Sequence, residues 1–213
     1  EICTAYDIKY ISDEVVTAFG RLGRMFASQD VFGIEPDIVT TAKGLTSGYQ
    51  PMSATVISDE IFEVISAKGT MFLHGMTYSS HPACAAAALA NIAILEREGI
   101  PERVLSTGKR FENGLRGLER HDIVGQVRGS HFMVGVEFVK DKASKDVFDD
   151  DAAVGKRVAS EAQQRGLIVR PLANMVIFSP PLILTEAQID EMVSIFSESI
   201  QGAMDGLKKD GFL

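Results

Sequence analysis

A carboxylate, an amine and a cluster of hydroxyl groups occur where short apolar runs of this sequence end. Asp13 ends the run that begins at Ile8, and Lys43 follows the β-branched run IVTT. A third segment, TYSS, supplies the hydroxyls and begins at Thr77. Because α/β sheets expose their ligand sites beyond the carboxyl ends of their strands, an acid and an amine at two strand ends indicate a shared site. The three segments thus offer an acid, an amine and a phosphate-sized set of donors.

Each of these residues also has a simpler explanation. A lysine in a loop is most often a solvated surface cation. Asp13 fits an ordinary acid at a strand end, and the adjacent Glu14 indicates that acids are placed there for other reasons as well. Thr77 fits a polar turn before a helix. Only the combination of the three argues for a chemical site.

The elements that would hold these residues follow from the sequence pattern. Three short runs rich in β-branched residues are bounded by glycine and proline, which predicts strands of a mainly parallel sheet buried on both faces. They span residues 10–12, 37–41 and 52–57. Helical spacing of apolar residues predicts helices over 59–67 and 81–98.

The rest of the chain is typical of a separate α+β domain. The pattern predicts a helix over 102–120, alternating strands within 123–140 and a helix over 152–165. Strand-like runs over 167–170, ending at Arg170, and over 175–178 flank a turn over 171–174. A capping box at Thr185 opens the last helix. Gly99 and Pro101 mark the domain boundary, so we expect one domain over residues 1–99 and a second over 100–213.

Composition narrows the possible partners. The formal net charge is −8 and no long basic run occurs, which argues against nucleic acid or an anionic membrane surface as a partner. No apolar run approaches the roughly 18 residues of a membrane helix. The two cysteines, Cys3 and Cys84, indicate a reducing compartment such as the cytoplasm. His74 and His81 have no third ligand nearby in the sequence, so we predict no metal site.

The order of these motifs resembles the class III, or omega, aminotransferases, which are pyridoxal-phosphate enzymes. Their signature runs from Asp-Glu-Val, here at Asp13, and a following Phe-Gly-Arg to a Thr-x-x-Lys-Gly loop, here at Lys43. The resemblance extends over nearly all of the chain. It implies an α/β chain of fold type I, made of the second half of the large, mostly parallel sheet domain (1–99) and the α+β C-terminal small domain (100–213). Because the family's chains are about twice as long, it also implies the C-terminal half of such an enzyme.

The resemblance implies a role for four residues. Lys43 matches the lysine that forms the Schiff base with pyridoxal phosphate and then carries the proton of the substrate. Asp13 matches the acid that keeps the ring nitrogen of the cofactor protonated, and Val15 matches the residue packed on the ring face. Thr77 matches the threonine that binds the cofactor phosphate across a dimer interface, so a homodimer is expected.

The resemblance also bears on the substrates. Arg170 matches the arginine that binds the carboxylate of pyruvate in one subgroup, whereas ornithine- and aminobutyrate-type relatives carry an arginine at the position of Ile177. We therefore expect transfer of an amino group from an amine or omega-amino acid to a keto acid, with pyruvate favoured. Three alternatives stay open: an aminomutase, a decarboxylase, or a non-catalytic fragment that keeps the fold. Arg170 could equally form a structural ion pair with the acidic tract 141–151.

Overall fold

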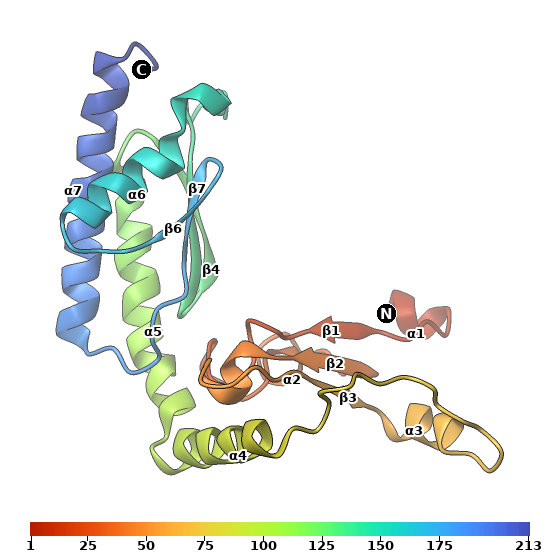
Figure 1. Cartoon of the computed structure of the whole chain (residues 1–213). Helices are drawn as coiled ribbons and strands as arrows, with labels where there is room; N and C mark the ends of the chain where they lie inside the picture. The colour runs from red at the N-terminus through yellow and green to blue at the C-terminus, as the bar shows by residue number, and fades with distance from the viewer. The chain divides into compact units, whose positions relative to one another are not determined.

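The computed structural model describes all residues from 1 to 213. The chain divides into two compact units, Glu1–Glu102 and Arg103–Leu213 (Figure 1). Each unit has a sheet of its own, with three strands in the first and four in the second.

The sheet of the first unit has the strand order β1-β2-β3. Its strands are β1 (Ile11–Asp13), β2 (Ile38–Thr41) and β3 (Ala54–Ile57). β1 and β2 are parallel, with Asp13 opposite Thr40. β3 is antiparallel to β2, so this strand departs from the mainly parallel arrangement expected from the sequence.

The direction of β3 follows from its connection to β2. The chain between them forms a 3-10 turn, η1 (Lys43–Thr46), and then a loop, without a crossover helix. A parallel return requires a crossover of a dozen or more residues, usually a helix, whereas a direct return gives an antiparallel strand. The sequence run predicted the strand but not its direction.

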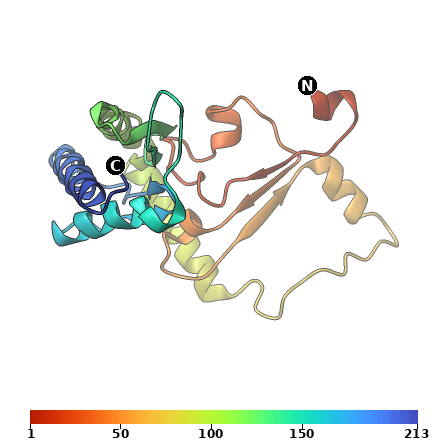
Figure 2. The same cartoon turned by 90° about the horizontal axis from the view of Figure 1, so that it is seen from above.

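The two helices predicted for the first unit are present as α3 (Asp59–Ile65) and α4 (Pro82–Arg97). The unit also has two short helices, α1 (Ile2–Ala5) and α2 (Ala27–Asp30). α4 begins with Pro82, whose missing N–H is not needed in the first turn of a helix. Between α3 and α4 the chain runs as a long extended connection (Figure 2).

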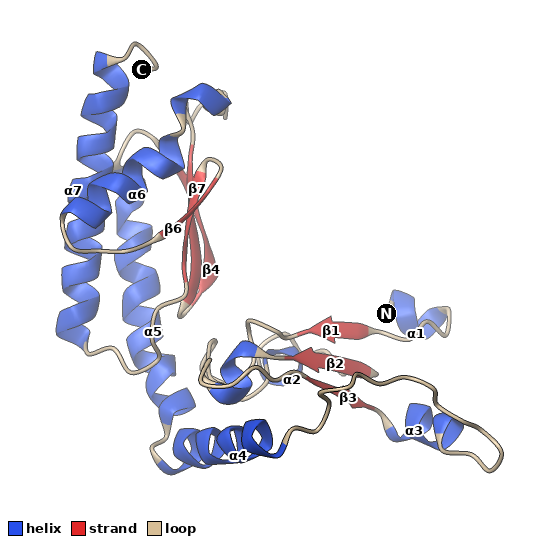
Figure 3. Ribbon diagram, in the orientation of Figure 1, coloured by secondary structure: helices blue, strands red, loops and turns tan.

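The second unit is an antiparallel sheet of order β4-β5-β7-β6 with helices packed on it. The strands are β4 (Val124–Ser130), β5 (Met133–Phe138), β6 (Arg170–Leu172) and β7 (Met175–Phe178). The helices are α5 (Ile100–Arg116), α6 (Val154–Gln164) and α7 (Glu186–Lys209), with short 3-10 turns η2 (Gly117–Arg120) and η3 (Asp150–Ala152). The three long helices lie on one side of this sheet (Figure 3).

The core of the second unit forms between that sheet and its helices. Val134, Val136 and Phe138 are buried on one face of β5, which confirms the predicted alternation. Four phenylalanines join the elements through edge-to-face ring contacts. The ring centroids are 5.7 Å apart for Phe111–Phe132, 5.5 Å for Phe111–Phe178 and 4.8 Å for Phe178–Phe196.

The start of α7 confirms the predicted capping box. Thr185 N–H donates to Gln188 Oε1 at 2.9 Å, and Gln188 N–H donates to Thr185 Oγ1 at 3.3 Å. These two bonds satisfy backbone donors that the first turn of a helix leaves without partners.

Candidate functional site

The acid and the amine predicted from the sequence lie at the same edge of the first unit's sheet. Asp13 is the last residue of β1 and is opposite Thr40 of β2, and Lys43 follows only three residues after Thr40. Because β1 and β2 are parallel, their carboxyl ends meet at this edge (Figure 1). Both side chains are exposed.

Asp13 and its neighbour Glu14 differ in their hydrogen bonds. Asp13 Oδ1 accepts the N–H of Val15 at 3.0 Å, which leaves the other oxygen of this exposed carboxylate available to a ligand. Val15 itself is half-buried next to it. Glu14 is 2% exposed, and both of its carboxylate oxygens accept hydrogen bonds from other groups of the protein.

The Glu14 carboxylate fastens the start of α2 to the end of β1. It accepts Ala27 N–H at 2.6 Å, Ser28 N–H at 2.8 Å and a short bond from the Ser28 hydroxyl. Thr17 Oγ1 adds a bond at 3.3 Å. Glu14 is therefore the structural acid of the pair, whereas Asp13 is the one that can meet a ligand.

The backbone of Lys43 is held in an uncommon conformation. Its φ angle is +33°, in the left-handed region where a non-glycine residue costs on the order of 1–3 kcal/mol. Its ammonium makes no hydrogen bond or ion pair in the structure. Such residues persist only when their surroundings determine the conformation, so the contacts of the segment Lys43–Ser47, called here the lysine loop, matter for the site.

Two neighbours hold the lysine loop. A Cβ on Gly44 would lie 3.0 Å from Phe19 Cβ and 3.2 Å from the Ala18 carbonyl, so glycine permits the close approach of the two loops. On the other side, the Asn91 side chain of α4 bonds to three groups of the loop. Sequence reasoning missed Asn91, although a single amide in an alanine-rich helix was a usable signal.

Thr77 lies in an exposed turn before α4. Ser79 N–H donates to the Met76 carbonyl at 2.9 Å, and Met76 N–H donates to Ser79 Oγ at 3.2 Å. The Thr77 hydroxyl has no hydrogen-bond partner, and none joins it to Asp13 or Lys43. The structure therefore gives Thr77 no hydrogen bond that links it to the other two residues within one chain.

Arg170 belongs to the second unit and begins β6, rather than ending a strand as the sequence suggested. It lies opposite Ile177 of β7. Val176 and Phe178 are buried, so Ile177 and its neighbour Arg170 are on the other face of the sheet. Arg170 is exposed and forms no ion pair, so the alternative of a structural pair with the acidic tract has no support.

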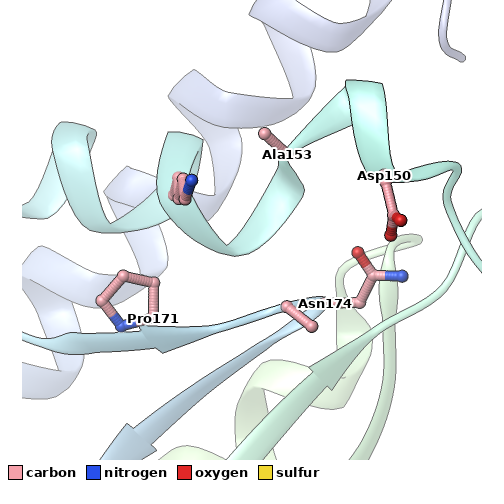
Figure 4. A pocket seen from close by; sticks show the side chains of 6 residues that line it. Asp150, Ala153, Pro171 and Asn174 are labelled. Carbon is pink, nitrogen blue, oxygen red and sulfur yellow. The ribbon is translucent and has the colours of Figure 1, made fainter.

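A hollow of about 320 Å³ lies between the start of α6 and the β6–β7 turn (Figure 4). Asp150, Ala153, Pro171 and Asn174 are among the residues that line it. Arg170 is not among them, although it precedes Pro171. This hollow is therefore distinct from the predicted site residues.

Two further properties of the chain concern ligands and membranes. No three His, Cys, Asp or Glu side chains are grouped so as to hold a metal ion. None of the helices combines the length and the apolar character needed to cross a membrane.

Known proteins share both the sequence and this fold. The model of the family "Aminotransferase class-III" matches residues 1–200. Gamma-aminobutyrate transaminase 1, mitochondrial, of Oryza sativa subsp. indica is 40% identical over 203 residues, which are 94% of this chain and 39% of the relative. The diaminobutyrate–2-oxoglutarate transaminase of Halomonas elongata is 40% identical over an alignment of 217 positions that covers 99% of this chain and 46% of the relative.

Solved structures agree with this match. A PMP-bound aminotransferase from Vibrio fluvialis has a TM-score of 0.89 and 38% identity, over 96% of this chain and 46% of its own. The fold is thus that of the fold type I transaminases, as expected. The chain belongs to the class III aminotransferase family and spans less than half the length of the relatives named here.

Proposed function

We propose that this chain is the part of a pyridoxal-phosphate-dependent aminotransferase that carries the reactive lysine and the acid for the cofactor ring. The observation that carries the proposal is the parallel pairing of β1 and β2, which puts Asp13 and Lys43 beyond the same sheet edge. Membership of the class III family supports it. Residues 1–99 would then be the C-terminal portion of the large domain, and residues 100–213 the small domain.

The residues present suit pyridoxal phosphate. The cofactor needs an amine to hold its aldehyde, an acid beside its ring nitrogen and donors for its phosphate. Lys43 is an amine without a partner, and Asp13 has a free carboxylate oxygen. Thr77 has an unused hydroxyl. When bound, the cofactor supplies an electron sink for the carbanion formed at the substrate's alpha carbon.

Each residue has a defined task in this proposal. Lys43 holds the cofactor until substrate arrives, and its amine then takes and returns the proton of the alpha carbon. Asp13 holds a proton on the ring nitrogen, and Val15 supports the face of the ring. Thr77 donates to the phosphate of a partner subunit, since no contact joins it to the other residues within one chain. This role of Thr77 requires a homodimer, and the two free cysteines support a reducing compartment, the cytoplasm.

The substrates we propose are an amine or omega-amino acid as donor and a keto acid, pyruvate first, as acceptor. Gamma-aminobutyrate and diaminobutyrate, in the names of two relatives, support an omega-amino acid as donor. A neighbouring structure described as a transaminase with L-alanine supports pyruvate, which is the keto acid of alanine. Arg170 would read the keto acid, because a guanidinium pairs both oxygens of a carboxylate.

The role of Lys43 is tested by trapping the cofactor in the complete protein. Borohydride reduction and peptide mapping should leave the pyridoxyl group on Lys43. Lys43→Ala should lose the label yet keep its fold, since it removes an exposed loop amine and no core volume. Lys68→Ala, which removes another exposed lysine of the same unit, is the matched control and should keep the label. A label on another lysine contradicts the assignment, and no label at all favours the non-catalytic alternative.

The role of Arg170 is tested by steady-state kinetics of the complete protein. Arg170→Ala or Arg170→Lys should raise KM for pyruvate at least about tenfold, the loss expected for a charged bidentate hydrogen bond. The half-reaction with an amine that lacks a carboxylate should change little. Equal damage to both half-reactions, or none to either, would show that Arg170 does not read the carboxylate.

A further inference from the structure

The turn of the lysine loop satisfies the Gly44 carbonyl, which accepts Ser47 N–H at 3.2 Å, but it gives no partner to the Leu45 carbonyl or to the Ser47 hydroxyl. The loop is a 3-10 turn that ends at Ser47, whose φ angle of +49° is also left-handed. Leu45 is 6% exposed, and its carbonyl accepts no backbone N–H in the structure. A buried carbonyl without a donor costs roughly 1–3 kcal/mol.

Asn91 of α4 satisfies these groups. Its Nδ2 donates to the Gly44 carbonyl at 2.8 Å and to the Leu45 carbonyl at 3.1 Å. Its Oδ1 accepts the Ser47 hydroxyl at 2.6 Å. One side chain thus bonds to three of the four residues that follow Lys43.

Only an amide of this length has the required groups. The Nδ2 atom donates to both carbonyls with its two N–H groups, and the Ser47 hydroxyl donates to the acceptor on the same side chain. An aspartate keeps the acceptor but places a second oxygen against two carbonyl oxygens. The arrangement is therefore specific for asparagine and not a general packing contact.

We infer that Asn91 is the positioning residue of the catalytic lysine. Asn91 and Gly44 hold the loop from two sides, Asn91 through α4 and Gly44 through its close approach to Phe19. Together they maintain the left-handed backbone of Lys43 and with it the direction of the amine. This inference rests on the proposed function, because it assigns a role only if Lys43 is the reactive amine.

The test uses the complete protein loaded with pyridoxal phosphate. Asn91→Asp should lower kcat about tenfold with KM for both substrates unchanged, since the amine is displaced while the substrate contacts remain. It should also slow the attachment of cofactor to Lys43, measured by borohydride labelling against time. Backbone hydrogen exchange of residues 44–48 should rise. Ser47→Ala loses one bond of the three and should show the same changes to a smaller degree.

Asn113→Asp is the matched control, because Asn113 is an exposed asparagine of the second unit. It should leave labelling, kcat and loop exchange unchanged. The inference would be overturned if Asn91→Asp and Ser47→Ala both left labelling and kcat unaffected. It would also be overturned if these substitutions raised KM without lowering kcat. A label on a lysine other than Lys43 in the unsubstituted protein would instead overturn the proposed function, so the two failures are distinguishable.

Discussion

The two units differ in how completely their sheets are covered. In the second unit, Val134, Val136 and Phe138 of β5 are at most 1% exposed. In the first unit, Ile11 of β1 is 57% exposed and Val56 of β3 is 54% exposed. α/β sheets normally have both faces covered, and exposed apolar groups on a sheet form a surface suited to contact with other protein groups.

The connection between α3 and α4 in the first unit is also poorly covered. Its large apolar side chains are exposed by 62% or more: Met71, Phe72, Leu73, Met76 and Tyr78. The proposed chemistry therefore lies in the less covered unit, whereas the unit with Arg170 has a core of its own. The largest buried core of this chain and its proposed chemistry therefore lie in different units.

The largest expected effect is in the core of the second unit. Phe111 is fully buried and contacts two other phenylalanine rings, so Phe111→Ala should reduce the free energy of unfolding of this unit by about 3–5 kcal/mol. Phe72 lies in the first unit and is 62% exposed. Phe72→Ala should change the free energy of unfolding of the first unit by no more than about 0.5 kcal/mol. Urea denaturation of the 213-residue chain followed by circular dichroism measures both. Equal losses in the two variants would break the comparison.

A smaller effect separates the two adjacent acids of the first unit. Glu14→Gln keeps the shape but turns an NH₂ group toward a buried backbone N–H of Ala27 or Ser28, which should cost about 1–3 kcal/mol locally. Hydrogen exchange of residues 25–33 should therefore rise, while that of the second unit stays the same. Asp13→Asn can still accept the Val15 N–H, so it should leave exchange unchanged and weaken cofactor retention in the complete protein. The reverse result would exchange the roles of the two acids.

The strand ends and the capped helix could be predicted because they depend on the local sequence pattern. The β-branched run before Lys43 and the apolar run before Asp13 predict strand ends, and Thr185 with Gln188 predicts a capped helix. These signals depend on neighbouring residues only. The structure accordingly has β1, β2 and α7 where the sequence indicated them.

What the sequence could not predict depends on distant contacts. The direction of β3 is set by the path of the preceding loop, and the partners of Glu14 lie 13 and 14 residues away. Asn91 is more than 40 residues from the loop that it holds. Periodicity contains no information about such pairings, so the supports of the site appear only in three dimensions.

The second unit also contains a buried acid that is paired across elements. Glu112 of α5 accepts Lys109 Nζ at 3.1 Å, Arg116 Nε at 3.0 Å and His131 N–H at 3.2 Å. Burial raises the pKa of Glu112, but these hydrogen bonds outweigh it and the pKa lies below the usual 4.5. Burial, with Lys109 nearby, holds the pKa of His131 below its usual 6.5.

The smallest expected effect is therefore a dependence of the second unit's stability on pH. The folded state binds a proton to His131 and to Glu112 less readily than the unfolded chain does, so acid favours unfolding. The free energy of unfolding should begin to fall as pH drops below 6.5 because of His131, and fall further below 4.5 because of Glu112.

His131→Asn tests this pH dependence, because asparagine suits the φ of +49° at this position. The substitution should reduce the slope of the free energy of unfolding between pH 6.5 and 5. Part of the slope should remain, since burial also lowers the pKa of His121. His81→Asn, at an exposed histidine of the first unit, is the control. Urea midpoints across this pH range measure the slopes, and a slope unchanged by His131→Asn would contradict the prediction.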